Sequence, residues 1–160
     1  MPKTLKQEIL FGLMMVVVMV YGMIAYNVTL SIGHLGPETF LVPLHSLPVM
    51  AIVAFSIEFF VVGKVAHWVT ERVAPFDPQR PMRTVVVMSV TTVMLMCPIM
   101  SLVATVFVNG VTGAEIPLAW AQTWLRNLPM AAVLQLAIAG PIVRAVFGRL
   151  MDAYAVRIAA

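Results

Sequence analysis

The sequence predicts an all-α integral membrane protein with four transmembrane helices, arranged as two helical hairpins that repeat in the same orientation. Three observations carry this prediction: an apolar composition, four apolar runs of membrane-spanning length, and a likeness between the two halves. Apolar residues make up 61% of the chain, charged residues make up 11%, and the mean hydropathy is +0.98. A soluble domain is roughly 45–50% apolar and about 25% charged, so we expect this chain to face lipid.

Four apolar runs define the predicted helices, because roughly 20 helical residues cross a bilayer core. The runs are Ile9–Ile32, Phe40 or Leu44 to Ala66, Thr84–Val108 and Trp124–Phe147. Two loops at 33–46 and 109–124 and a proline-rich linker at 70–83 connect them. The first run is too long for the apolar part of a signal peptide and lacks a small-residue cleavage site, so we expect the chain to retain it.

The linker divides the chain into two transmembrane helix pairs, residues 1–69 and 84–160. Nine of the ten lysines and arginines lie on the side of the termini and the linker, and Arg126 alone lies on the other side. Because Lys and Arg are enriched in cytoplasmic loops, both termini are predicted to be cytoplasmic. The net charge of +3 then reports topology and indicates no nucleic-acid partner.

The two halves repeat in two different registers. Pairing each position i with i+77 aligns Met19 with Met96, Met23 with Met100 and Gly33 with Gly110. Pairing i with i+81 aligns Leu47-Pro48 with Leu128-Pro129, Ile57 with Ile138 and Val62 with Val143. This shift predicts a longer outer loop in the second half and places Glu58 opposite Ala139. Each unit is a helix pair, so the repeat is parallel.

Glu58 is the acidic residue inside the second apolar run. It lies six residues before Lys64, about 9 Å along a helix, which is too deep for a short side chain to reach water. A charge at such depth costs on the order of 2.5 kcal/mol or more, so it is usually paired, protonated or in a water-filled cavity. Glu58 is therefore either a group that binds protons or cations, or the ion-pair partner of Arg144.

Three more polar residues are candidates to bind protons or a solute together with Glu58. Gln135 lies within one helical turn of the position aligned with Glu58, and Asn27 lies inside the first span. His45 lies in the first predicted loop, where a histidine can relay protons. The alternatives stay open, because polar groups at membrane depth commonly form interhelical hydrogen bonds and loop histidines are commonly ordinary interfacial residues.

Trp120, Trp124 and Arg126 lie where the second loop meets the fourth span. Tryptophans one helical turn apart at such a place are typical interfacial anchors, and contact with lipid head groups or a solute at the outer surface is the role open to Arg126. The 13 methionines raise the alternative of a copper site, since thioethers prefer Cu(I). Methionine also fills gaps in apolar packing, and Met96 and Cys97 point to different helix faces. We therefore expect no metal site.

The sequence gives no indication of catalysis. It contains no phosphate-binding loop, dinucleotide-binding turn, zinc-protease motif or paired-cysteine motif, and these are the patterns that carry nucleotide and metal chemistry. No nucleophile–base set is recognisable either. We therefore expect no enzyme activity and no cofactor.

Several short motifs mark the second half: Met88-Ser89, Met100-Ser101, Asn109-Gly110, Trp124-Leu-Arg126, Pro129 and Gly140-Pro141-Ile-Val-Arg144. With these motifs, Arg83 to Leu150 resembles a bacterial family of paired-helix membrane proteins known only as a domain of unknown function, DUF2798. The first half resembles a diverged copy, which keeps Met19, Met23, Gly33 and Pro48. It lacks the tryptophan–arginine element and the Gly-Pro turn. The resemblance implies a small protein of the bacterial inner membrane and supplies no activity.

The tandem plan is also similar in outline to the proteobacterial antimicrobial-compound efflux proteins, which use a membrane-embedded glutamate. Their glutamate belongs to the first helix, where this chain has only Glu8 at the mouth, so no residue is carried over. We expect a small secondary transporter that exports a cationic or amphipathic solute in exchange for protons. The alternative is a non-transporting accessory or scaffold protein. Because four helices enclose little volume, we also expect a homodimer in the lipid bilayer.

Overall fold

The computed structural model describes residues 5–75, 81–108 and 110–159, and every regular element in these ranges is helical. The elements are α1 (Leu5–Ile32), α2 (Glu38–Ile57), the π-helical turn η1 (Glu58–Val62), α3 (Gly63–Val73), α4 (Pro81–Val103), the π-helical turn η2 (Ala104–Val108), the 3-10 turn η3 (Gly113–Glu115), α5 (Ile116–Val133), the π-helical turn η4 (Leu134–Ala139) and α6 (Gly140–Ala159). Residues 76–80 of the predicted linker and Asn109 of the second predicted loop lie outside the described residues.

Four helical segments of the described chain are long and apolar enough to cross a membrane. They are Lys6–Ile32, Glu38–Val73, Met82–Phe107 and Gly113–Ala153. The second joins α2, η1 and α3 into one continuous helix, and the fourth joins η3, α5, η4 and α6. The prediction of an all-α fold with four such helices is confirmed, and four candidate spans are typical of a multi-pass membrane protein.

The connections between the helices are shorter than predicted. α2 begins at Glu38, so the first connection is residues 33–37 and not 33–46. α5 begins at Ile116, well before Trp124, and α3 continues to Val73. The prolines made these segments look like loops, but Pro117 lies in the first turn of α5, where its missing N–H removes no helical hydrogen bond.

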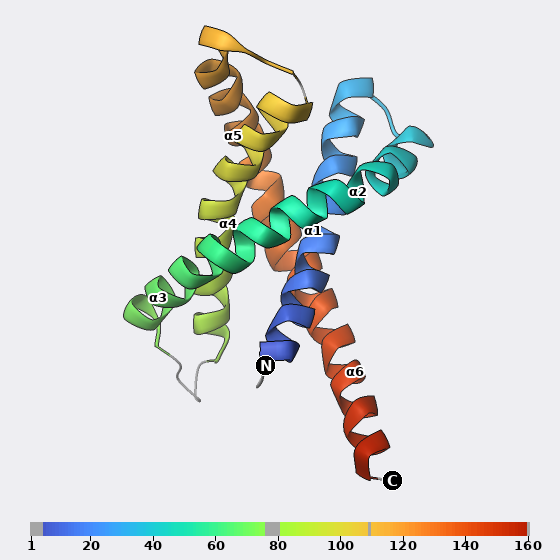
Figure 1. Ribbon diagram of the computed structural model, residues 1–160, viewed down its shortest axis with the longest axis vertical. Coiled ribbons are helices and arrows are strands. Elements are labelled where there is room, and N and C mark those ends of the chain that lie inside the picture. Colours follow the sequence, from blue (N-terminus) through green and yellow to red (C-terminus); the bar gives the residue numbers. More distant parts are fainter. Residues whose placement is uncertain (1–4, 76–80, 109, 160) are drawn as a thin grey trace.

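The four segments run alternately up and down in Figure 1, and they cross one another. The N-terminal end of α1, the C-terminal end of α3, the N-terminal end of α4 and the C-terminal end of α6 lie in the lower part of the view, and the α1–α2 connection and the ends of η2 and η3 lie at the top. α1 packs against α2, and α4 packs against α5. The two hairpins are joined by contacts of α3 with α4 and of α1 with α5, η4 and α6.

Each hairpin has its own small apolar core, and the two cores correspond position by position. The first core consists of Val16, Val20, Ala51 and Ala54. The second core consists of Val93, Cys97 and Ala131. The register i to i+77 relates Val16 to Val93, Val20 to Cys97 and Ala54 to Ala131. Buried positions in both helices of the hairpin therefore repeat in the same register.

The single register i to i+77 thus relates the two halves, and the register i to i+81 predicted for the second helices is wrong. Gly33 and Gly110, which follow α1 and η2, have positive φ angles of 75° and 65°. The π turns η1 and η4 are followed by Gly63 and Gly140, a second glycine pair in the same register. A slip of four residues is about one helical turn, so it returns similar apolar residues to the same face. The apolar pattern alone therefore could not fix the register.

Candidate functional site

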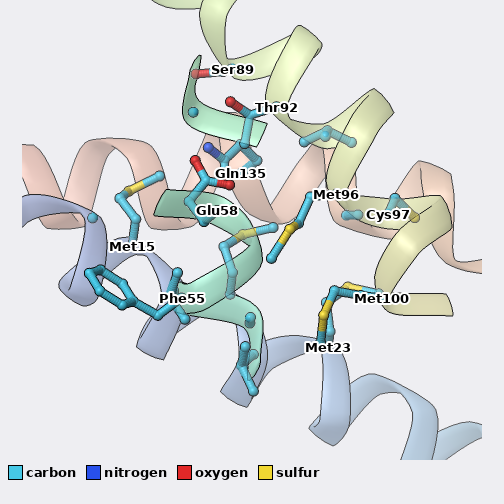
Figure 2. A pocket seen from close by; sticks show the side chains of 18 of the residues that line it. Met15, Met23, Phe55, Glu58, Ser89, Thr92, Met96, Cys97, Met100 and Gln135 are labelled. Carbon is cyan, nitrogen blue, oxygen red and sulfur yellow. The ribbon is translucent and has the colours of Figure 1, made fainter. Parts of the chain in front are cut away.

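A cavity of about 1420 Å³ lies between the two hairpins, and residues from α1 to α6 and from η1, η2 and η4 line it. The π turns η1 and η4 both contact α1 and α4, so these four elements surround its middle. Figure 2 shows the side chains of this region, Glu58 and Gln135 among them. Ordinary ligand pockets measure about 300–1,000 Å³, so the cavity has room for a drug-sized molecule together with water.

Glu58 and Gln135 occupy the same position of two matching π turns. The backbone N–H of Gly63 donates to the Glu58 carbonyl, and that of Gly140 donates to the Gln135 carbonyl. A Cβ atom on Gly63 would lie 2.9 Å from the Glu58 oxygen, and one on Gly140 would lie 2.7 Å from the Gln135 oxygen. Both distances are too short for a side chain, so glycine permits this close backbone approach. π turns of this kind occur frequently at functional sites.

The Glu58 side chain is half-buried, and no described residue forms a hydrogen bond or an ion pair with it. Arg144 lines the same cavity, but its guanidinium folds back along its own helix. Its Nη2 atom lies 2.7 Å from the position of a Cβ on Gly140. The ion pair between Glu58 and Arg144, predicted as the alternative, is therefore not formed in the structure.

Three neutral polar side chains, Ser89, Thr92 and Gln135, line the cavity near Glu58, as Figure 2 shows. Gln135 is 6% exposed and Ser89 is 7% exposed. None of the three side chains forms a hydrogen bond with a described residue. Their polar atoms stay accessible from the cavity, so water or a polar ligand there can form hydrogen bonds with them.

Of the two other predicted binding residues, Asn27 lines the cavity and His45 does not. The Asn27 amide Nδ2 donates to the Met23 carbonyl at 2.8 Å within its own helix. His45 is exposed on α2, whereas its neighbour Ser46 lines the cavity. The sequence placed His45 in a loop, but helical geometry fixes its direction, and it lies outside this site.

Trp120 and Trp124 hold α5 against α4. Their rings stack with centroids 5.9 Å apart, and Trp120 Nε1 donates to the Pro98 carbonyl at 2.8 Å. Trp124 packs against the second core, and its Nε1 is buried without a partner among the described residues. Both indole N–H groups are turned into the protein, and the role of these residues as interfacial anchors stays a prediction. Arg126 is exposed and lines the cavity.

Two further polar residues of the cavity, which the sequence did not predict, have buried side-chain atoms without a partner in the described chain. Asn127 is 5% exposed and Thr70 is 4% exposed, and both line the cavity. Asn127 Oδ1 and Thr70 Oγ1 are buried, and neither has a hydrogen-bond partner in the described chain. One signal was available for Asn127, because it lies about two helical turns before Gln135 and therefore on the same side of the helix. Thr70 had none, since the span was predicted to end at Ala66.

Thioethers and aromatic rings make up much of the remaining wall. Met15, Met23, Met96, Met100 and Phe55 all line the cavity in Figure 2. Met96 and Met100 pack against the first core, and Met23 packs against the second. These side chains are apolar and polarizable, and methionine adapts to ligands of different shape. The cavity is therefore mostly apolar, with one carboxylate at its middle.

The profile of a protein family described as a domain of unknown function (DUF2798) matches the chain twice, over residues 4–74 and 82–151. The chain belongs to this family. The first positions of the two matches, 4 and 82, and the last positions, 74 and 151, fit the structural register i to i+77 to within one position. The resemblance predicted from the second half is confirmed, and the profile also covers the first half.

One relative has the same extent as this chain. The uncharacterized protein YybC of Bacillus subtilis (strain 168) is 31% identical over 150 residues, which cover 92% of each protein. No solved structure matches the chain. Since neither the family nor this relative carries an assigned activity, function has to be argued from the cavity.

Proposed function

We propose that the protein is a small secondary transporter of the bacterial inner membrane, which exports a cationic or amphipathic small solute in exchange for protons. One observation carries the proposal: Glu58 lies within a candidate span and lines the large cavity, and no described residue pairs with it. An ionisable residue at membrane depth is expensive to keep, so it marks a functional site by default.

In this mechanism Glu58 binds either a proton or the positive charge of the solute. Because one carboxylate cannot hold both, a proton that binds from one side releases the solute to that same side. When Glu58 gives up this proton on the opposite side, the carboxylate is free to bind the next solute there. The other titratable or charged groups that line the cavity are Glu8 of α1, Lys64, His67 and Glu71 of α3, Cys97 of α4, Arg126 of α5 and Arg144 of α6. Arg126 lies nine residues before Gln135, about 13.5 Å along the helix, whereas the Arg144 guanidinium lies beside Gly140, the glycine that follows the second π turn.

The arrangement of the ends supports cytoplasmic termini. The N-terminal end of α1, the C-terminal end of α6 and the facing ends of α3 and α4 lie in the same part of the molecule (Figure 1). Nine of ten cations belong to these ends or to the sequence next to them, and of these Lys3 and Arg80 lie outside the described residues. The Arg72 guanidinium lies 4.1 Å from the centroid of the exposed Trp68 ring, and such residues are common at a membrane surface. Residues of one chain line the cavity. The homodimer, which was expected because four helices enclose little volume, stays a prediction.

Proteoliposomes that contain a pH-sensitive dye test this proposal. A proton gradient is imposed, a panel of organic cations is added in turn, and the pH inside the vesicles is followed. We expect at least one cation to drive proton flux in the wild-type protein and Glu58→Gln to abolish that flux. Glu38→Gln is the matched control, because Glu38 is an exposed acid of the same continuous helix and does not line the cavity.

The assay separates the transporter from its alternative. Full proton flux in Glu58→Gln vesicles would contradict the role given to this carboxylate. If no cation drives flux in the wild-type protein, the transporter proposal fails, and a non-transporting accessory role becomes the better account. A melting temperature in detergent measured for each variant distinguishes loss of flux from loss of folding.

A further inference from the structure

We infer that the cavity selects hydrophobic organic cations that carry a single positive charge, such as a quaternary phosphonium ion. This inference rests on the proposed function and names the substrate class of the same site. It is carried by the juxtaposition of Glu58 with its repeat counterpart Gln135 in a mostly apolar cavity. The charged group of the cavity wall beside the second π turn is a cation, because Arg144 Nη2 lies 2.7 Å from the position of a Cβ on Gly140.

The repeat sets the charge count of the site. Each chain has two equivalent positions on matching π turns, and one holds a carboxylate while the other holds a neutral amide. Ser89 and Thr92 beside them are also neutral. A ligand with one positive charge is therefore neutralised by Glu58. A second positive charge on the ligand would lie near neutral Gln135 and the Arg144 guanidinium, so it would be buried without an anionic partner, which is costly in a low dielectric.

The wall of the cavity favours a large and diffuse cation. Phe55 and Phe59 stack with centroids 5.8 Å apart, and both line the cavity together with the methionines Met15, Met19 and Met23. Aromatic faces attract cations, and thioethers offer a polarizable apolar surface. An ion that is itself hydrophobic enters such an environment with little loss of hydration, unlike a small hydrated ion.

The described residues also disfavour a metal ion as the cargo. No group of three or more His, Cys, Asp or Glu side chains in them could hold a metal ion. Hard divalent cations are bound by six or more oxygen ligands, and Glu58 supplies only one carboxylate. Neutral hydroxyl and amide groups suit a ligand that needs one counter-ion and a few hydrogen bonds.

Two matched ligands test the inference in the purified full-length protein. Benzyltriphenylphosphonium carries one charge, and para-xylylene-bis(triphenylphosphonium) carries two charges on a similar aromatic framework. Binding of each is measured by isothermal titration calorimetry in nanodiscs, with empty nanodiscs as the blank. We expect the singly charged ligand to bind wild-type protein about tenfold more tightly than the doubly charged one. Glu58→Gln should weaken binding of both ligands.

The decisive variant is Gln135→Glu, which places a carboxylate at the equivalent position of the second π turn. This change should reverse the preference, so that the doubly charged ligand binds about tenfold more tightly than the singly charged one. Gln135→Met, of similar length and without charge, should leave the wild-type preference in place. Melting temperatures of all variants in the presence of ligand confirm that the binding-competent fold is retained.

The results distinguish this inference from the proposed function. If wild-type protein binds both phosphonium ions equally, or if Gln135→Glu leaves the preference unchanged, charge selection is overturned, while Glu58-dependent proton flux with another cation would keep the transporter. If flux is absent for every cation and the singly charged ligand still binds through Glu58, the site chemistry stands and transport fails. Absence of phosphonium binding overturns the inference directly.

Discussion

η1 and η4 share one backbone conformation, a π-helical turn that is followed by a glycine, yet they present different side chains to the same cavity. In each turn the backbone carbonyl of a polar residue accepts a hydrogen bond from the backbone N–H of a glycine five residues later, at Gly63 in one case and at Gly140 in the other. Glu58 on the first turn is charged and half-buried, and Gln135 on the second is neutral and 6% exposed. Two neighbouring carboxylates would disfavour each other's ionisation. The comparison indicates that duplication made two equivalent positions and that one keeps the acid.

Exchanging the two side chains is expected to have the largest effect on this comparison. Glu58→Gln alone should abolish cation-driven proton flux, because it removes the group that exchanges the proton for the solute. The double variant Glu58→Gln/Gln135→Glu should recover a large part of that flux, because the carboxylate returns at an equivalent place. Flux assays on the single and double variants check this, and a double variant no better than the single one would show that the π turns are not functionally equivalent.

Substitutions of the glycines after the two π turns test whether the turns are equivalent in their effect on stability. Gly63→Ala and Gly140→Ala each place a Cβ within 3.0 Å of a backbone oxygen, so each should destabilise the fold by about 1–3 kcal/mol. We expect Gly63→Ala to reduce cation binding as well, because it disturbs the turn that carries Glu58. Thermal unfolding and calorimetric titration measure the two effects.

Gly148→Ala is the control for these glycine substitutions. Nothing lies within 4 Å of its added Cβ, so helix propensity alone predicts a gain of about 0.5–1 kcal/mol. Equal losses of stability at Gly63, Gly140 and Gly148 would contradict the explanation by close backbone approach.

The smallest expected effect lies at the far ends of the two hairpins. Trp120 Nε1 donates to the Pro98 carbonyl, and the first half has Pro43 at the position equivalent to Trp120. Trp120→Phe should cost about 0.5–1.5 kcal/mol through loss of this hydrogen bond and should leave cation binding unchanged. Thermal unfolding checks the stability change. A loss of binding of tenfold or more would place the indole in the ligand path instead.

The sequence predicted much of the fold and part of the site. Its apolar runs located the four long helices, and Glu58 was identified because a charge inside such a run is costly to bury. Gln135 was predicted because it lies within one helical turn of Ala139, with which the wrong register paired Glu58. In the structural register, Gln135 is itself the residue equivalent to Glu58. His45 was placed in the site because it was assigned to a loop, and the earlier start of α2 removes it. Side-chain direction in a helix depends on register, which prolines and glycines obscured here.

By itself, the sequence determined that the chain folds into four long apolar helices in two related pairs, because apolar runs of this length and the repeated glycines and methionines are local properties of the chain. Only the tertiary structure decided the register of the repeat and therefore which side chains face each other. A helical pattern looks the same after a slip of one turn, whereas the five-residue hydrogen bonds and the two packed cores occur in one register alone.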